Sequence, residues 1–204
     1  MQSILTITTP AAAAQQRLCT LVALKSELGI TDTASDVALE QKIDEASGAI
    51  ADYCQRVFAQ ESASEAFRLS QSVKSLSLSR WPVSAIASVT IDGAAVDDAA
   101  YEVDPANGLL WRIDGDQRSA WAHGRVVVAY TAGYALPAAA PSALSRACIL
   151  LASTWWQGRG RDATIRSEST DGVDNVSYFD PRNGGGALPS AVTDPIERYR
   201  ATAV

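Results

Sequence analysis

The spacing of apolar residues changes twice along the chain, and this change limits the possible folds more than any other feature. In residues 36–58 apolar side chains recur at alternating steps of four and three, which places them on one face of a helix. Helical spacing returns after Pro141. Proline is favoured in the first turn of a helix, because the N–H that it lacks would have no partner there. The two apolar stripes comprise Leu39, Ile43, Ala46, Ile50, Tyr53 and Val57, and Leu144, Cys148, Leu151 and Trp155.

The residues between these helices, 64–131, are typical of antiparallel β structure. Their short apolar runs are separated by turn signals, three of which are residue pairs that supply the positive φ angles of tight hairpins. A compact sheet or small barrel is expected. The three pairs are Asp92-Gly93, Asn107-Gly108 and Asp114-Gly115.

This order of elements predicts an α+β fold with a discontinuous helical bundle body and an inserted small antiparallel β domain. We expect residues 1–60 and 132–204 to form the helical body, and residues 61–131 to form the insert. The two long helices are expected to pack antiparallel through their apolar stripes and to form the main core.

Three segments have less regular patterns. Residues 3–9 alternate apolar and polar side chains, which predicts a half-buried strand or an extended arm that pairs with a neighbouring subunit. Residues 158–188 have little periodicity and are rich in Gly, Asp, Ser and Arg, so we expect a long loop or hairpin. Residues 188–200 resemble a short helical tail that is interrupted at Pro195.

Charge and composition exclude several classes of protein. The chain has 17 basic and 23 acidic residues and a formal charge of −6, which argues against a protein that grips phosphate backbones. A negative wall would instead repel DNA and let a duplex slide past. No stretch approaches the roughly 20 apolar residues of a membrane helix, and the first residues lack a basic signal region, so a cytoplasmic protein is expected.

The sequence offers little reactive chemistry. His123, the single histidine, precedes a strand in a Trp-Ala-His-Gly segment and is interpreted as a turn residue. Cys19, Cys54 and Cys148 are odd in number, far apart and interpreted as reduced thiols, the last two in the core. Asp114-Gly115-Asp116 lacks the further ligands of a calcium loop and is interpreted as a hairpin turn, and Asp171, Asp174 and Asn175 are interpreted as solvated loop residues instead of cation ligands. We predict no catalytic residue, no metal and no cofactor.

Two groups of residues suggest contact surfaces. Arg159, Arg161 and Arg166 form the one notable basic cluster, which either contacts DNA or a partner's carboxylates or is simply solvated. Trp155 and Trp156 point in different directions on a helix, so one can fill the core while the other lies at a subunit contact. The alternative is that both rings are buried.

Five motifs in order resemble the head-tail connector family of long-tailed bacteriophages, in its longer form with an inserted β region. The resemblance covers most of the chain. Trp155-Trp156, in place of a more usual tyrosine-arginine ending, and Pro195, in a tail that is more leucine-rich in the family, depart from the pattern. The motifs are residues 20–28 (TLVALKSEL), residues 43–56 (IDEASGAIADYCQR), residues 78–89 (LSRWPVSAIASV), residues 128–134 (VAYTAGY), and Pro141 with the helix after it.

The resemblance implies a structural virion protein that forms a ring, usually dodecameric, beneath the portal and extends the DNA channel. It implies contacts with the portal protein, with tail or stopper proteins, and with genomic DNA that passes without sequence-specific binding. Assembly in the host cytoplasm is expected. The residues assigned to these roles are Leu188, Ile196, Tyr199 and Arg200 for portal binding; Ile4, Ile7 and Trp156 for the subunit interface; and Arg159, Arg161 and Arg166 for a channel or partner loop.

Two other functions are considered. The β segment could be a binding module for a carbohydrate or a protein, with Trp81, Trp111 and Trp121 as a stacking surface. An enzyme is the weakest alternative, because neither a base, a nucleophile with its partner nor a metal set is visible in the sequence.

Overall fold

The computed structural model describes residues 2–160, 167–170, 174–177 and 188–201. The chain divides into two compact units, one built mainly from strands and the other mainly from helices. The β unit comprises Met1–Gln15 and Val57–Leu136, and the helical unit comprises Gln16–Arg56 and Pro137–Val204. The chain therefore passes from one unit to the other three times.

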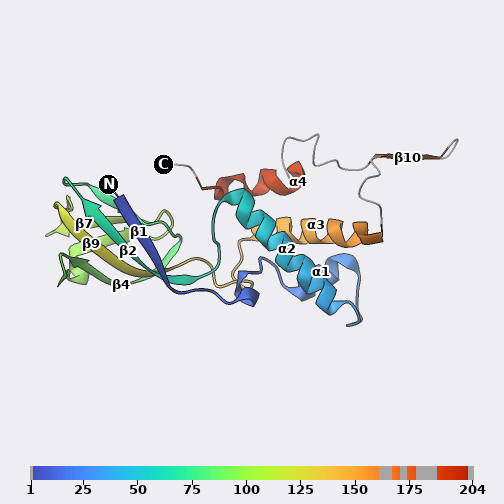
Figure 1. Cartoon of the computed structure of the whole chain (residues 1–204), viewed down its shortest axis with the longest axis horizontal. Helices are drawn as coiled ribbons and strands as arrows, with labels where there is room; N and C mark the ends of the chain where they lie inside the picture. Colours follow the sequence, from blue (N-terminus) through green and yellow to red (C-terminus); the bar gives the residue numbers. More distant parts are fainter. Residues whose placement is uncertain (1, 161–166, 171–173, 178–187, 202–204) are drawn as a thin grey trace. The chain divides into compact units, whose positions relative to one another are not determined.

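The β unit contains a five-stranded antiparallel sheet in the order β1-β2-β9-β4-β5. Figure 1 shows β1, β2, β9 and β4 side by side. The expected turn at Asp92-Gly93 joins β4 to β5 with φ angles of 50° and 89°. The strands are β1 (Gln2–Thr9), β2 (Glu61–Leu69), β9 (Gly124–Ala132), β4 (Val83–Ile91) and β5 (Ala94–Ala95).

A second antiparallel sheet has the order β3-β7-β6, with β8 paired to β7. Side chains from both sheets form one apolar cluster that includes Phe67, Leu76, Leu110 and Trp121. Trp121 is fully buried and its indole N–H donates to the carbonyl of Leu110 at 3.1 Å. The strands are β3 (Ser75–Ser77), β7 (Leu109–Asp114), β6 (Tyr101–Asp104) and β8 (Gln117–Ser119).

A buried carboxylate lies within this apolar cluster. Glu65 of β2 is 0% exposed, and it accepts hydrogen bonds from the backbone N–H of Ser79 at 2.9 Å, from the Ser79 hydroxyl at 2.6 Å and from the Tyr130 hydroxyl at 3.0 Å. Burial and the adjacent Glu65 charge raise the pKa of Tyr130 above its ordinary value, so the phenol remains a donor. Glu65 thus fastens β2 to β9 and to the β3–β4 connection.

The helical unit is organised around two long helices, α2 (Asp36–Cys54) and α3 (Ser142–Gln157), which pack against each other. Most of each predicted apolar stripe is confirmed, since Leu39, Ile43, Leu144 and Leu151 are all buried. At the ends of the stripes the prediction is wrong: Tyr53 is half-buried, Val57 lies beyond α2, and Trp156 is buried instead of Trp155. The shorter elements of this unit are α1 (Leu21–Leu28), α4 (Ser190–Thr193), and 3₁₀ segments at Gly158–Gly160 and Asp194–Tyr199; the 3₁₀ segments Ala13–Gln16 and Asp98–Ala100 lie wholly or mainly in the β unit.

The helix boundaries follow local backbone chemistry. Thr20 caps α1 by accepting from the N–H of Ala23 at 3.2 Å, and Gly29 ends this helix in the left-handed conformation. Helix α2 ends at Cys54 and not near residue 58, because Gln55 adopts a left-handed φ of 50° and the N–H of Arg56 donates to the carbonyl of Ala51. The sequence contains no signal for this helix end, because the left-handed position is occupied by Gln55 and not by glycine.

The expected helical bundle body is wrong, although the α+β class is correct. Residues 2–9, expected to be a half-buried strand or an N-terminal arm of the helical body, form a strand that pairs along β2, because their alternating pattern finds its hydrogen bonds at a sheet edge. The strands therefore form a unit with its own core instead of a small insert. In the irregular segment after α3, the described residues form the hairpin β10 (Ser167–Thr170) and β11 (Asp174–Ser177).

All three cysteines are free and buried. The Sγ atoms of Cys19 and Cys148 are 3.5 Å apart, and burial raises the pKa of Cys54 to about 11. Their thiols therefore behave as small core side chains.

Among the described residues, none of the helices combines the length and apolar character needed to traverse a lipid bilayer.

We predict that Glu65→Ala destabilises the protein by about 2–4 kcal/mol, because it leaves the donors on Ser79 and Tyr130 without an acceptor and opens a cavity. Glu102→Ala is the matched control: Glu102 forms an ion pair with Arg118, both side chains are 55% exposed, and a change within about 0.5 kcal/mol is expected. Urea unfolding measures both. Equal midpoints for the two variants would contradict this role for Glu65.

Candidate assembly surfaces

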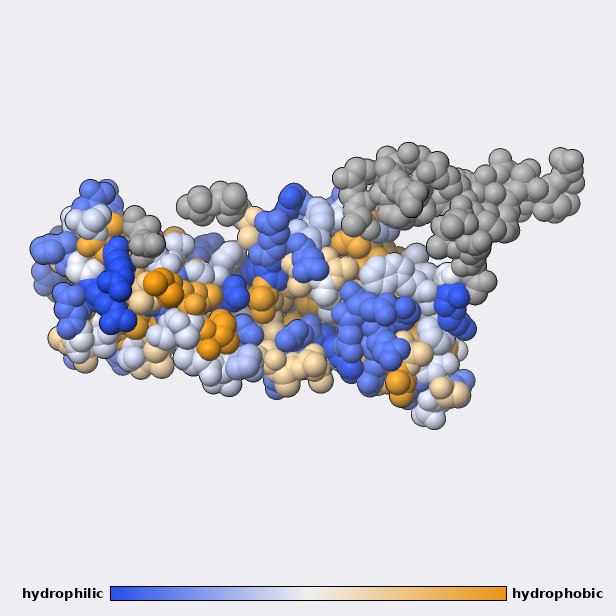
Figure 2. All heavy atoms as spheres, viewed as in Figure 1, coloured by the Kyte–Doolittle hydropathy of each residue, from blue (hydrophilic) through white to orange (hydrophobic). Residues whose placement is uncertain are grey.

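The first strand forms one edge of the five-stranded sheet. On one side β1 pairs with β2 from Gln2↔Arg68 to Thr9↔Ser62, and no other described strand pairs with its second side. Ile4 is 56% exposed, whereas Ile7 is half-buried and packs with Leu5 against the core cluster. Figure 2 shows hydrophobic side chains gathered over β1. Of the two predicted interface residues here, Ile4 is the one with substantial free surface.

The opposite side of the same sheet has a second open edge. β4 pairs with β9 along its length, but β5 covers only Thr90 and Ile91. Residues 84–88 of β4 therefore have no strand partner on that side within the described part of the chain. Ser84, Ala85, Ala87 and Ser88 are exposed, and only Ile86 of this stretch packs against the core.

The C-terminal tail packs on the chain's own helices. Ile196, predicted as a portal anchor, is 0% exposed and lies in the core of the helical unit, and the nearby Val192 is also buried. The N–H of Ala201 donates to the carbonyl of Cys54 at 2.8 Å. Of the other predicted portal-binding residues, Leu188 and Tyr199 are half-buried and Arg200 is exposed. The accessible part of this surface thus lies around Tyr199 and Arg200.

A polar contact holds the tail to α2. The hydroxyl of Tyr53 donates to Glu197 at 2.5 Å, and this hydrogen bond raises the pKa of Tyr53 and lowers that of Glu197. Arg200 pairs with Glu197 at 3.3 Å, and its guanidinium carbon lies 5.4 Å from the centre of the Tyr53 ring. The contact weakens as pH falls through the lowered pKa of Glu197, because protonation removes the carboxylate charge.

Trp156, the other predicted interface residue, is 8% exposed and belongs mostly to the core, whereas Trp155 is half-buried. The guanidinium carbon of Arg159 lies 3.8 Å from the centre of the Trp156 ring, and its Nη1 donates to the Trp156 carbonyl at 2.7 Å. Trp156 therefore holds the guanidinium of Arg159 in place and has little exposed surface for a contact of its own. Arg161 and Arg166 lie outside the described residues.

The tryptophans of the β unit do not share an exposed stacking face. Trp121 is fully buried, and Trp111 is half-buried beneath the guanidinium of Arg118, which lies 3.9 Å from its ring centre. Trp81 is half-buried beside a cis bond to Pro82. This arrangement gives no support to a carbohydrate- or protein-binding surface in which these three rings supply the stacking face.

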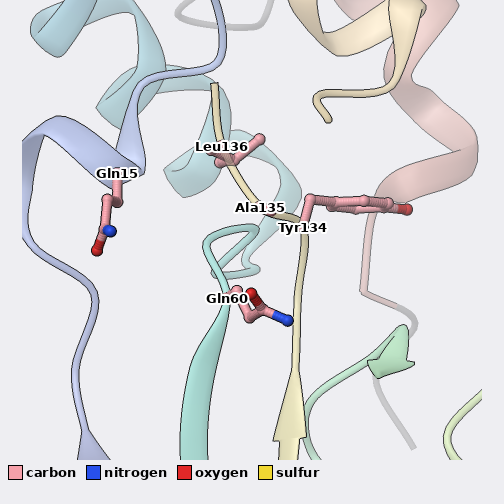
Figure 3. Close-up of a pocket in the computed structure, with 5 residues that line it drawn as sticks. All are labelled: Gln15, Gln60, Tyr134, Ala135 and Leu136. Carbon is pink, nitrogen blue, oxygen red and sulfur yellow. The ribbon is translucent and has the colours of Figure 1, made fainter. Parts of the chain in front are cut away.

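One small pocket lies where β2 and β9 leave the sheet. Figure 3 shows its lining, with Gln15 reaching in from the N-terminal segment and Gln60 lying beside the strand of Tyr134. The N–H of Gln60 donates to the Tyr134 carbonyl at 3.0 Å. The lining offers amide groups and a phenol, without a carboxylate or an imidazole, so it can hydrogen-bond but provides no acid–base pair. The full lining is Gln15, Gln60, Tyr134, Ala135 and Leu136.

The structure adds two surface residues that were not predicted. Val22 on α1 is 77% exposed and Val37 on α2 is 74% exposed. Their signal in the sequence is an apolar side chain placed off the buried stripe of an amphipathic helix.

His123 is exposed in a bend before β9, as expected of a turn residue. Among the described residues, no three His, Cys, Asp or Glu side chains gather into a metal site.

Comparisons with known proteins match this chain over nearly its whole length. The model of the family described as "HCP: Head completion protein" matches residues 17–202. A search of curated proteins finds no match.

Solved structures with the same fold come from gene transfer agent (GTA) particles. One is a chain from the neck of an empty GTA particle computed with C6 symmetry, at a TM-score of 0.59 and 19% identity. Another is from the virion of a native particle, at 0.59 and 20%, and a third is from the neck of a native particle computed with C12 symmetry, at 0.57 and 19%. Each likeness covers 98% of this chain and 97% of the other.

We predict that Ile196→Ala lowers the free energy of unfolding by about 2–5 kcal/mol, because it removes a fully buried side chain from the helical core. Val37→Ala is the matched control, since Val37 is 74% exposed and its truncation should change stability by less than about 0.5 kcal/mol. Thermal and urea unfolding measure the difference. A negligible effect of Ile196→Ala would show that the tail is not part of the folded core.

Proposed function

Because the chain belongs to the head completion protein family, and is therefore a structural head-tail connector of the virion and not an enzyme, we propose that its copies form a ring beneath the portal. The observation that carries this proposal is the family match, which spans residues 17–202 and so includes most of both units. The resemblance to phage connectors based on the sequence motifs is confirmed by this match.

The symmetry of the neighbours supports a ring of twelve. The two neck structures of the same fold carry C6 and C12 symmetry, and a six-fold axis is contained in a twelve-fold one. A ring built from one kind of chain requires a heterologous contact, in which two different surfaces of each copy meet. Virion localisation follows from the family, and we propose that assembly takes place in the host cytoplasm.

The charge of the chain suits a channel through which DNA moves. With a formal charge of −6 per copy, a ring repels the phosphate backbone. Genomic DNA would then pass without sequence-specific binding. Arg159, Arg161 and Arg166 are proposed as contacts to the channel or to a tail or stopper protein, where cationic side chains can pair with a partner's carboxylates.

Tyr199 and Arg200 are proposed to contact the portal protein, with Leu188 at the start of the same tail. Arg200 is 51% exposed in its ion pair with Glu197, so a partner can reach its guanidinium. Ile196 is buried and supports this surface from below. Tyrosine and arginine beside each other are typical of the residues that contribute most to protein interfaces.

Electron microscopy of the purified chain, alone and with its cognate portal protein, tests the ring. We expect closed rings with twelve-fold symmetry that sit coaxially on the portal. A chain that remains monomeric at high concentration and never joins the portal would contradict the proposal.

We predict that Arg200→Glu weakens portal binding at least tenfold while the protein remains folded, because it reverses the charge on the proposed contact. Arg118→Glu is the matched control, since Arg118 is 55% exposed and, like Arg200, forms an ion pair with a glutamate, Glu102. Binding is measured by biolayer interferometry and folding by circular dichroism. Equal losses in the two variants would show that charge in general, and not this tail surface, governs binding.

A further inference from the structure

We propose that neighbouring copies in the ring are joined by strand addition, with β1 of one copy pairing with the open edge of β4, residues 84–88, in the next copy. This inference rests on the proposed ring and identifies the two surfaces that meet in it. Both surfaces are edges of the same five-stranded sheet.

The first argument is the backbone of β1. An edge strand presents unpaired N–H and C=O groups on its outer side, and these groups readily accept another strand. β1 is paired with β2 from Gln2 to Thr9, with a register shift between Ile7 and Thr9, so most of its backbone is already extended before a partner arrives. Little conformational entropy would then be lost when the second strand binds.

The second argument is that both edges lack charged side chains and proline, two of the devices that protect an open edge; a β-bulge is a third, and both strands contain an irregularity of that kind. Natural proteins block open edges with charged side chains or proline. The sequence of β1, QSILTITT, contains neither, and residues 84–88 of β4, SAIAS, contain neither. Apart from Gln2 and Leu5, their residues are small, β-branched or hydroxyl-bearing, which favours pairing, and the absence of charge avoids repulsion between copies of the same acidic chain.

The third argument is strand direction. β1 is antiparallel to β2, β2 to β9, and β9 to β4, so β1 and β4 run in opposite directions within one sheet. When a rotated copy places its β4 beside β1, the antiparallel alternation continues across the junction. The same contact can repeat from copy to copy until the ring closes.

Side-chain sizes at the two edges also fit. Ile4 is 56% exposed on β1, and the outward residues Ala85 and Ala87 of β4 are small enough to leave room for it. β4 has register shifts on its β9 side between Val83 and Ala85 and between Ile86 and Ser88, so the added ladder is expected to be short. A pairing of β1 with β1 of another copy would stop at a dimer and leave the β4 edge uncovered.

Disulfide cross-linking tests the pairing, with Thr6→Cys combined with Ala85→Cys in one variant and with Ala87→Cys in another. Under copper–phenanthroline oxidation, which takes two electrons and two protons from each thiol pair, at least one double variant should form a ladder of covalent oligomers up to the closed ring. The wild type and the single variants should remain uncross-linked, because Cys19, Cys54 and Cys148 are buried. A ladder that is absent from both double variants, or a Thr6→Cys dimer, would overturn the proposal.

Thr6→Lys provides a second test that needs no cross-link. A lysine on the edge of β1 should weaken ring formation at least tenfold in sedimentation velocity while leaving the melting temperature unchanged. Thr33→Lys, at an exposed turn before α2, is the control and should assemble as the wild type does. Rings that persist in Thr6→Lys would refute the strand contact but leave the ring itself intact, whereas a wild type without rings would refute the proposed function.

Discussion

The hydrogen-bonded carboxylate of Glu65 is the constraint on which the β unit depends. A buried charge is tolerated only when its acceptor sites are filled, and here Ser79 and Tyr130 supply three donors from two other parts of the chain. A shift of β2 by one residue would turn Glu65 to the opposite face and place its neighbours in the core. The register of β2 against β9 is thereby fixed, and with it the positions of β1 and β4 on the two outer sides.

This arrangement explains why one motif of the connector resemblance needs its particular residues. In the segment VAYTAGY, Tyr130 donates to Glu65, and Gly133 has a φ of 108° in a place where a Cβ atom would collide with the backbone of Ala59. Only glycine meets both conditions. The two amphipathic helices and the hairpin turn at Asp92-Gly93 could be predicted from the sequence, because apolar spacing and turn chemistry are properties of short, continuous segments.

The features that could not be predicted depend on contacts between distant residues. Residues 2–9 pair with a strand that begins at Glu61, and Ile196 fills a core formed by helices that end far earlier in the chain. Alternation and amphipathicity indicate that a segment needs a partner, but they do not identify it. The same limit applies to Trp121 and Trp156, which were considered as ligand or subunit surfaces and contribute mainly to the core.

A ring made from acidic chains must overcome the repulsion between its own copies, and this requirement bears on where they touch. Each copy carries a formal charge of −6, so an interface built from side-chain charges would place many carboxylates close together unless each were paired. Backbone hydrogen bonds carry no net charge, and the two open sheet edges are the uncharged segments QSILTITT and SAIAS. In the proposed ring, acidic side chains can then remain on the other surfaces, where they would repel passing DNA without opposing closure of the ring.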